Sequence, residues 1–302
     1  MNYLLGMLLI VVSAASFGAM PIFARFAYDA GINTASLLFF RFFLGALFMI
    51  PIALARKRRF PKGRDLLVLI AMGAVGYAGQ AYTFFTALTL IPASLVSILL
   101  YLYPIFVAVL SVFFLGEVLT GKRIFALGIA VSGAALVIGF EIGGHLAGIL
   151  YGVSAALIYS VYNIVGAWVM KRNDTLNASL VIILSAAGVY LGMGLFQGMD
   201  IPTQPEVWIS ITAIGFVSTF VAISAYFKGM TLIGPVNASM LSTFEPVTTV
   251  LLAALFLDQY IGWSQILGGA LILCSALIVA SHAGNKEQMP SQSGSDTAAD
   301  NA

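Results

Sequence analysis

The feature that most constrains this chain is a succession of apolar runs, each about 20 residues long, joined by short connections. A helix that crosses a membrane needs about 20 consecutive, mostly apolar residues. Only 9% of the residues are charged and 61% are hydrophobic, so a water-soluble fold could not bury the apolar surface. The sequence therefore predicts an all-α integral membrane protein with ten transmembrane helices, at 4–28, 34–55, 65–88, 93–115, 122–140, 146–170, 177–199, 206–231, 236–257 and 262–282.

The first run could instead be a secretory signal peptide. It lacks a positively charged start, and its apolar stretch is longer than that of a signal peptide. It also has a counterpart in the second half of the chain, at 146–170. We therefore count it as a spanning helix.

The charges between the runs predict which side of the membrane each connection faces. With ten spans, the basic connections all lie on one side, which the positive-inside rule assigns to the cytoplasm. Their basic residues are Arg56, Lys57, Arg58, Arg59, Lys62, Arg64, Lys122, Arg123, Lys171 and Arg172. The opposite connections carry Asp29, Glu141, Asp200, Glu206 and Asp258. Both termini are expected in the cytoplasm, and the polar residues 284–302 are expected to form a disordered tail there.

The chain resembles itself at an offset of 142 residues. The matches pair Gly6 with Gly148, Thr89-Leu90-Ile91 with Thr231-Leu232-Ile233, Ser97 with Ser239, and Pro104 with Pro246. Each half, 1–140 and 141–283, holds five of the expected helices. Because five is odd, the second half enters the membrane from the opposite side, which gives two inverted repeats. This architecture is typical of secondary transporters, whose substrate sites lie near the midplane between the repeats.

Glu245 is the most unusual residue within an expected span. It lies about ten residues into its helix, at a depth of about 15 Å and near the membrane midplane. A carboxylate at that depth costs at least ~2.5 kcal/mol, so it should face a cavity or a partner. Ser242 shares its helix face. We predict a role for Glu245 in substrate binding or proton coupling, with a structural carboxylate as the alternative.

Three prolines within expected spans predict helix breaks or hinges: Pro21, Pro104 and Pro246. The last two occupy matching positions in the two halves, and such paired breaks point to a central site. Tyr103 takes the position of Glu245 in the first half, so the two halves would offer the cavity unlike chemistry.

Further polar side chains within apolar runs are candidates for the cavity lining: Gln80, Tyr82, Tyr159, Asn163 and Arg41. Amides and tyrosines could hold a zwitterion, although interhelical hydrogen bonds are the simpler explanation for them. Arg41 could bind substrate, pair with Glu245 or Asp29, or extend its charge toward the membrane surface.

Two sets of motifs carry a resemblance to a known family. The first comprises Ile91-Pro-Ala-Ser-Leu-Val-Ser, Tyr103-Pro104, Phe114-Leu-Gly-Glu117, Gly128 and Gly133, and the second Glu245-Pro246, Asp258-Gln259, Gln265 and Gly269. They resemble the two EamA repeats of the drug/metabolite transporter superfamily. The second set departs from that pattern, because Gln259 stands at the repeat position of Glu117.

The resemblance implies a central cavity lined by the first, third, fourth, sixth, eighth and ninth helices. It also implies export of amino acids or related metabolites across a bacterial inner membrane by alternating access, with protons as a candidate coupling ion. An exchanger of phosphorylated metabolites or nucleotide sugars is an alternative, and a channel or lipid-handling protein is another. No HExxH, GxSxG or paired-cysteine motif indicates an enzyme, and we expect no metal, cofactor or nucleic-acid partner.

Overall fold

The computed structural model describes residues 2–88, 90–91, 93–138, 145–256 and 261–287, and every regular element within these ranges is helical. Residues 2–138 form α1 (Asn2–Gly18), α2 (Met20–Asp29), α3 (Thr34–Ala55), α4 (Gly63–Ala71), η1 (Met72–Tyr77), α5 (Ala78–Leu88), α6 (Ala93–Leu100), α7 (Tyr103–Leu115) and α8 (Gly121–Ile138). Residues 145–287 form α9 (Leu146–Met170), α10 (Thr175–Gln197), α11 (Pro205–Gly215), η2 (Phe216–Val221), α12 (Ala222–Ile233), α13 (Pro235–Leu241), η3 (Ser242–Phe244), α14 (Glu245–Phe256) and α15 (Trp263–Glu287).

Within the described residues, eight helical stretches are long and apolar enough to cross a membrane. They are Asn2–Tyr28, Thr34–Ala55, Gly63–Phe84, Gly121–Ile138, Leu146–Met170, Thr175–Gln197, Pro205–Ile233 and Pro235–Phe256. Two of the ten expected spans are represented by shorter apolar helices, Tyr103–Leu115 and Trp263–Val279.

Some expected boundaries differ from those observed. The segment 93–115 was expected to be one span, and a turn at Tyr101–Leu102 divides it into α6 and α7. At the other end of the chain, α15 continues to Glu287, so its helix includes the first residues of the predicted tail. The rest of that tail, 288–302, lies outside the described residues.

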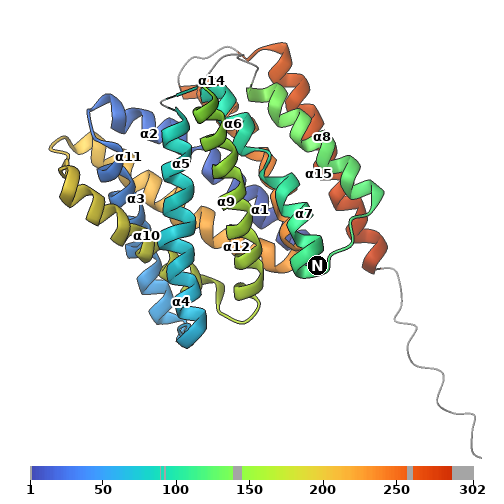
Figure 1. The fold of residues 1–302 in the computed structure, drawn as a ribbon, viewed down its shortest axis with the longest axis horizontal. Coiled ribbons are helices and arrows are strands. Elements are labelled where there is room, and N and C mark those ends of the chain that lie inside the picture. Colours follow the sequence, from blue (N-terminus) through green and yellow to red (C-terminus); the bar gives the residue numbers. More distant parts are fainter. Residues whose placement is uncertain (1, 89, 92, 139–144, 257–260, 288–302) are drawn as a thin grey trace, which may run out of the picture.

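The helices form a bundle with a clear centre and two edges (Figure 1). The helices α8 and α15 pack along each other at one edge, and α3, α10 and α11 form the opposite edge. Between them lie α1, α9 and α12, with α1 packed along α12. The central helices therefore have protein neighbours on several sides, and polar side chains between them can be shielded from lipid.

A pair of glycine contacts relates the two halves. A Cβ atom on Gly6 would lie 2.5 Å from Ile233, and one on Gly148 would lie 2.6 Å from Ile91. Both glycines and both isoleucines match at the 142-residue offset. The first helix of each half therefore approaches the equivalent segment of the other half closely, and only glycine permits that distance.

Two π-helical turns occur at nearly equivalent places in the halves. They begin at Met72 and Phe216, within two residues of the repeat offset, and each interrupts a long spanning helix. The extra residue of a π turn rotates the following side chains relative to a regular helix, and such turns are frequent at functional sites. Here they re-aim Tyr77 and Thr219, as described below.

Each of the three prolines for which a break or hinge was expected lies in the first turn of a helix. Pro21 lies at the start of α2, Pro104 is the second residue of α7, and Pro246 is the second residue of α14. Proline fits the first turn of a helix because the N–H groups there have no intrahelical partner. The chain can therefore begin a new helix at each point.

Candidate functional site

Arg41 is a buried cation in the first half of α3. It is 6% exposed, so it does not reach the membrane surface. Its Nε donates a hydrogen bond to Thr219 Oγ1 at 3.0 Å, and its Nη2 donates to Tyr77 Oη at 2.9 Å and to the Ser218 carbonyl at 3.4 Å. Both π-helical turns, one from each half, thus converge on this guanidinium.

The π turn η2 explains why Thr219 can accept from Arg41. The Thr219 hydroxyl donates its own proton to the carbonyl of Ile214, five residues earlier, at 3.1 Å. Its lone pairs are then available to the guanidinium. Among the side chains that the structure describes, no carboxylate lies within 4.0 Å of Arg41, so its contacts there are with neutral groups.

A series of tyrosine rings leads away from Arg41 through the centre of the bundle. The ring of Tyr77 stacks on Tyr162 with centroids 5.6 Å apart, and Tyr162 stacks on Tyr159 at 5.9 Å. Tyr159 meets Tyr103 edge-on at 4.7 Å, and Tyr103 lies 6.5 Å from Tyr101. These rings come from η1, α9, α7 and the turn before α7, and they form one continuous aromatic surface.

Glu245 lies at the far end of this tyrosine series. It is the first residue of α14, and its side chain lies near Tyr101. It is also close enough to Arg41 for the two side chains to interact electrostatically. The carboxylate and the guanidinium therefore belong to one polar region, linked by aromatic rings.

The break in the first spanning helix lies beside Glu245. A Cβ atom on Gly18 would lie 2.6 Å from the Glu245 carbonyl oxygen, and the Thr249 hydroxyl donates to the Gly18 carbonyl at 2.9 Å. Thr249 thus supplies a hydrogen bond to a carbonyl next to the break. The end of α1 is consequently fixed against the residue that starts α14.

A small cavity lies among the rings between α1, η1, α9 and α12. Its lining residues are Phe17, Tyr77, Tyr159, Tyr162, Ile223, Tyr226 and Phe227. Its volume is about 10 Å³, which is room for about one water molecule. The aromatic side chains thus fill most of the space, and the site has a closed conformation in this structure.

The other predicted site residues fall into two groups. Asn163 is fully buried and accepts a hydrogen bond from the hydroxyl of Tyr226, which lines the cavity. Ser242 is buried, and its hydroxyl donates to the Ala238 carbonyl at 2.9 Å. Gln80 is half-buried, and Tyr82 is 57% exposed on α5. The structure does not bring Tyr82 to the central cavity.

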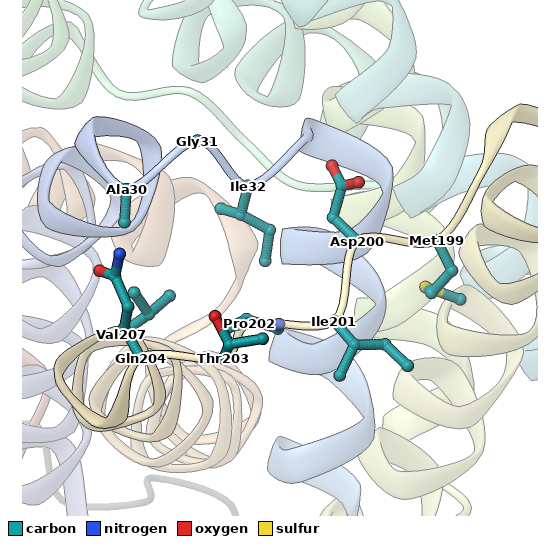
Figure 2. A pocket seen from close by; sticks show the side chains of 10 residues that line it. All are labelled: Ala30, Gly31, Ile32, Met199, Asp200, Ile201, Pro202, Thr203, Gln204 and Val207. Atoms are coloured by element: carbon teal, nitrogen blue, oxygen red, sulfur yellow. The ribbon is translucent and has the colours of Figure 1, made fainter.

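A larger pocket lies between two loops away from this centre (Figure 2). It has a volume of about 310 Å³ and shares no lining residue with the central cavity. Its walls are Ala30–Ile32 and Met199–Gln204, together with Val207. Asp200 joins the two loops, because its carboxylate accepts from the Asn33 amide at 3.0 Å and its amide donates to Ser36 at 2.8 Å. The sequence analysis did not predict this pocket.

These features define a multi-pass helical membrane protein with a polar, aromatic site shielded from lipid. Comparison with known sequences gives the family: EamA-like transporters match residues 4–139 and again residues 146–281. The chain belongs to the EamA-like transporter family, as the sequence motifs predicted.

Individual relatives are distant but extend over most of the chain. An uncharacterized transporter of Archaeoglobus fulgidus is 24% identical over 89% of this chain and 94% of its own length. The aromatic amino acid exporter YddG of Ancylobacter novellus is also 24% identical, over 68% of this chain and 71% of its own. A solved crystal structure superposes with a TM-score of 0.80 at 20% identity, covering 94% of this chain and 99% of the other, so the fold is shared.

Proposed function

We propose that this protein is a secondary active transporter that exports amino acids or related small metabolites by alternating access. The observation that carries the proposal is the closed central cavity with aromatic walls, one of which, Tyr77, accepts a hydrogen bond from the buried guanidinium of Arg41. A substrate site near the midplane, between two halves of one chain, is the arrangement of secondary transporters. The relative from Ancylobacter novellus is an aromatic amino acid exporter, which supports the substrate class.

We further propose ten spans in two inverted five-helix repeats, 1–140 and 141–283. The equivalent glycine contacts of Gly6 and Gly148 and the two π-helical turns support this arrangement. By the positive-inside rule, the protein would lie in the bacterial cytoplasmic membrane with both termini in the cytoplasm. The cavity would then open to one side of the membrane and afterwards to the other, as the two repeats move relative to each other about the prolines in the first turns of α7 and α14.

Transport by the purified protein tests the proposal. Proteoliposomes are loaded with an unlabelled amino acid, and uptake of the same labelled compound is followed across a panel of amino acids. Saturable counterflow of at least one member is expected, as for a carrier. Linear, non-saturable flux would indicate a channel, and absence of counterflow across the whole panel would contradict the proposal.

An exchanger of phosphorylated metabolites is the second candidate. It would require several cations around the substrate, because a phosphate carries more than one negative charge. Among the described residues that are buried, Arg41 is the only charged one. Counterflow of sugar phosphates or nucleotide sugars, included in the same panel, would favour this candidate over amino-acid export.

A further inference from the structure

One corner of the bundle carries most of the positive charge of the chain. It consists of 56–65, which joins α3 to α4 and begins α4, and of 171–174, which joins α9 to α10. We call these two segments the basic corner. They contain eight cations and two carboxylates, a net charge of +6, whereas the whole chain has a net charge of +2. The rest of the chain is therefore net negative, and the positive charge is local.

We infer that the basic corner binds the headgroup of an anionic phospholipid, whose acyl chains lie along the apolar side chains next to it. The inference concerns a lipid of the surrounding bilayer and goes beyond the transported substrate. It does not depend on the proposed transport function.

Hydrogen bonds tie the two segments of the basic corner together. The start of α4 packs beside the end of α9 at one end of the bundle (Figure 1). Asp65, in the first turn of α4, accepts from Arg172 Nη2 at 3.0 Å and from Asn173 Nδ2 at 2.8 Å. The buried amide of Asn177 donates to two successive carbonyls, at 58 and 59, at 3.2 and 3.3 Å. The cations therefore project from one braced surface and not from two independent loops.

Both carboxylates of the basic corner already have partners within it. Asp65 binds Arg172 and Asn173, and Asp174 accepts from the backbone amide of Asn177 at 3.1 Å, where it caps α10. Among the residues that the structure describes, none of the other seven cations of the corner forms an ion pair, and all seven are exposed. Like charges gathered on one surface repel one another and attract anions. The missing countercharge must come from outside the chain.

The apolar neighbours of the basic corner favour a lipid as the source of that charge. Leu54 in the last turn of α3 and Leu67 in α4 are exposed on either side of the cations, and Phe60 is exposed among them. The ring of Trp168 is also exposed, and the Arg172 guanidinium stacks over it with 3.8 Å between Cζ and the ring centroid. Aromatic residues of this kind lie at the level of the headgroups in membranes. A phospholipid offers an anionic phosphate and apolar chains together, whereas a soluble anion would leave the apolar side chains without a partner.

Trp168 can report the lipid that occupies the site. The chain has three tryptophans, so Trp208→Phe with Trp263→Phe leaves Trp168 alone. The protein is placed in phosphatidylcholine vesicles that contain either brominated phosphatidylglycerol or brominated phosphatidylcholine, because bromine quenches a nearby tryptophan. One cation at an anionic surface is worth ~1 kcal/mol, or about fivefold in affinity. Phosphatidylglycerol should therefore be preferred at Trp168 by about fivefold or more, and equal quenching by the two lipids would overturn the inference.

Substitutions then separate a local site from general surface charge. Arg58→Gln with Arg59→Gln keeps the backbone carbonyls that Asn177 holds and should lower the preference by about fivefold. The matched control, Lys122→Gln with Lys228→Gln, removes the same charge from exposed positions on α8 and α12 and should leave the preference unchanged. An equal fall in both double variants would contradict a local site.

A soluble headgroup distinguishes a lipid from a free phosphate. Excess glycerol 3-phosphate, added at constant ionic strength, should leave the quenching by brominated phosphatidylglycerol unchanged. Loss of the preference for phosphatidylglycerol in its presence would assign the basic corner to a soluble anion and overturn the inference.

Thermal unfolding tests the same site in the native chain. In nonionic detergent, added phosphatidylglycerol should raise the unfolding midpoint of the wild type more than phosphatidylcholine does, and Arg58→Gln with Arg59→Gln should remove the difference. This comparison decides the question if the tryptophan variants do not fold, and equal midpoints with the two lipids in the wild type would overturn the inference. Neither result affects the counterflow experiment, so the proposed transport function is tested separately.

Discussion

Arg41 and Thr219 are 178 residues apart in the sequence and are joined by a 3.0 Å hydrogen bond from Nε to Oγ1 at the centre of the bundle. The contact links a spanning helix of the first half to the π-helical turn of the second. It places a cation, shielded from lipid, beside the aromatic cavity. The two halves therefore contribute different chemistry to one site.

Removing the Thr219 hydroxyl should destabilise the protein. Thr219→Val keeps the shape of the side chain but takes an acceptor from Arg41 and a donor from the Ile214 carbonyl. Leaving buried polar groups without partners costs about 1–3 kcal/mol, so the midpoint of thermal unfolding in detergent should fall. Thr203→Val, at an exposed loop position, is the control. An unchanged midpoint for Thr219→Val would argue against the Arg41 contact.

The glycine contacts predict matched effects in the two halves. A methyl group at Gly6 or Gly148 would overlap Ile233 or Ile91, so Gly6→Ala and Gly148→Ala should each destabilise the protein by about 1–3 kcal/mol. Gly188→Ala in α10 has open space around it and should be neutral or slightly stabilising, because alanine favours helix. Thermal unfolding of the three variants measures this. Tolerance at one position but not the other would contradict equivalent packing of the halves.

The proposed topology predicts opposite exposure of two loops. The single cysteine is first removed by Cys274→Ala, and Lys57→Cys or Thr203→Cys is then added at an exposed position. A membrane-impermeant maleimide should label the thiol at 57 only in inverted vesicles and the thiol at 203 only in right-side-out cells. The reverse pattern would mean that the orientation is opposite to the one proposed. Labelling of both thiols from the same side would contradict the ten-span topology.

If Glu245 exchanges a proton during transport, its amide variant should lose the response of transport to pH. The rate of wild-type counterflow or efflux should change with pH between about 5 and 8, whereas Glu245→Gln should give a flat profile, because an amide does not titrate in this range. Glu206→Gln removes an exposed carboxylate from α11 and should keep the wild-type profile. A pH response that persists in Glu245→Gln would exclude this coupling role.

The sequence predicted the features that depend on apolar length. Spanning helices follow from the cost of exposing polar backbone to lipid, so most of the apolar runs reappear as long helices. The breaks at Pro104 and Pro246 follow from the missing N–H group of proline. The burial of Asn163 and Ser242 agrees with the cost of placing polar groups against hydrocarbon.

The details of the site could not be read from helical periodicity. The π turn at Met72–Tyr77 adds a residue to its turn, which shifts the phase of the helix by about 100° between the residues before and after it. If 65–88 is treated as one regular helix, the side chains either before or after the π turn are therefore predicted to point in the wrong direction. Tyr82 was a predicted cavity residue but is exposed, whereas Tyr77 turns inward onto Arg41.

The partners of Arg41 had no signal in the sequence. Ser218 and Thr219 are ordinary helix residues in an apolar segment, and only the π-helical conformation of η2 places them against a helix of the other half. Tyr226 likewise belongs to no sequence pattern that would predict its hydrogen bond to Asn163. Pairings between distant segments depend on tertiary packing, which one sequence without relatives does not encode locally.

The central claim is that the aromatic cavity is the substrate site and opens alternately to both sides of the membrane. A thiol is introduced by Ile223→Cys, which lines the cavity, in the Cys274→Ala background, with Leu157→Cys on an exposed face of α9 as the control. A small, membrane-impermeant, thiol-reactive reagent is applied from either side with and without L-phenylalanine. The account predicts modification of position 223 from both sides, slowed by the amino acid, and no protection at position 157. No reaction from either side, or reaction that no transported amino acid slows, would contradict it.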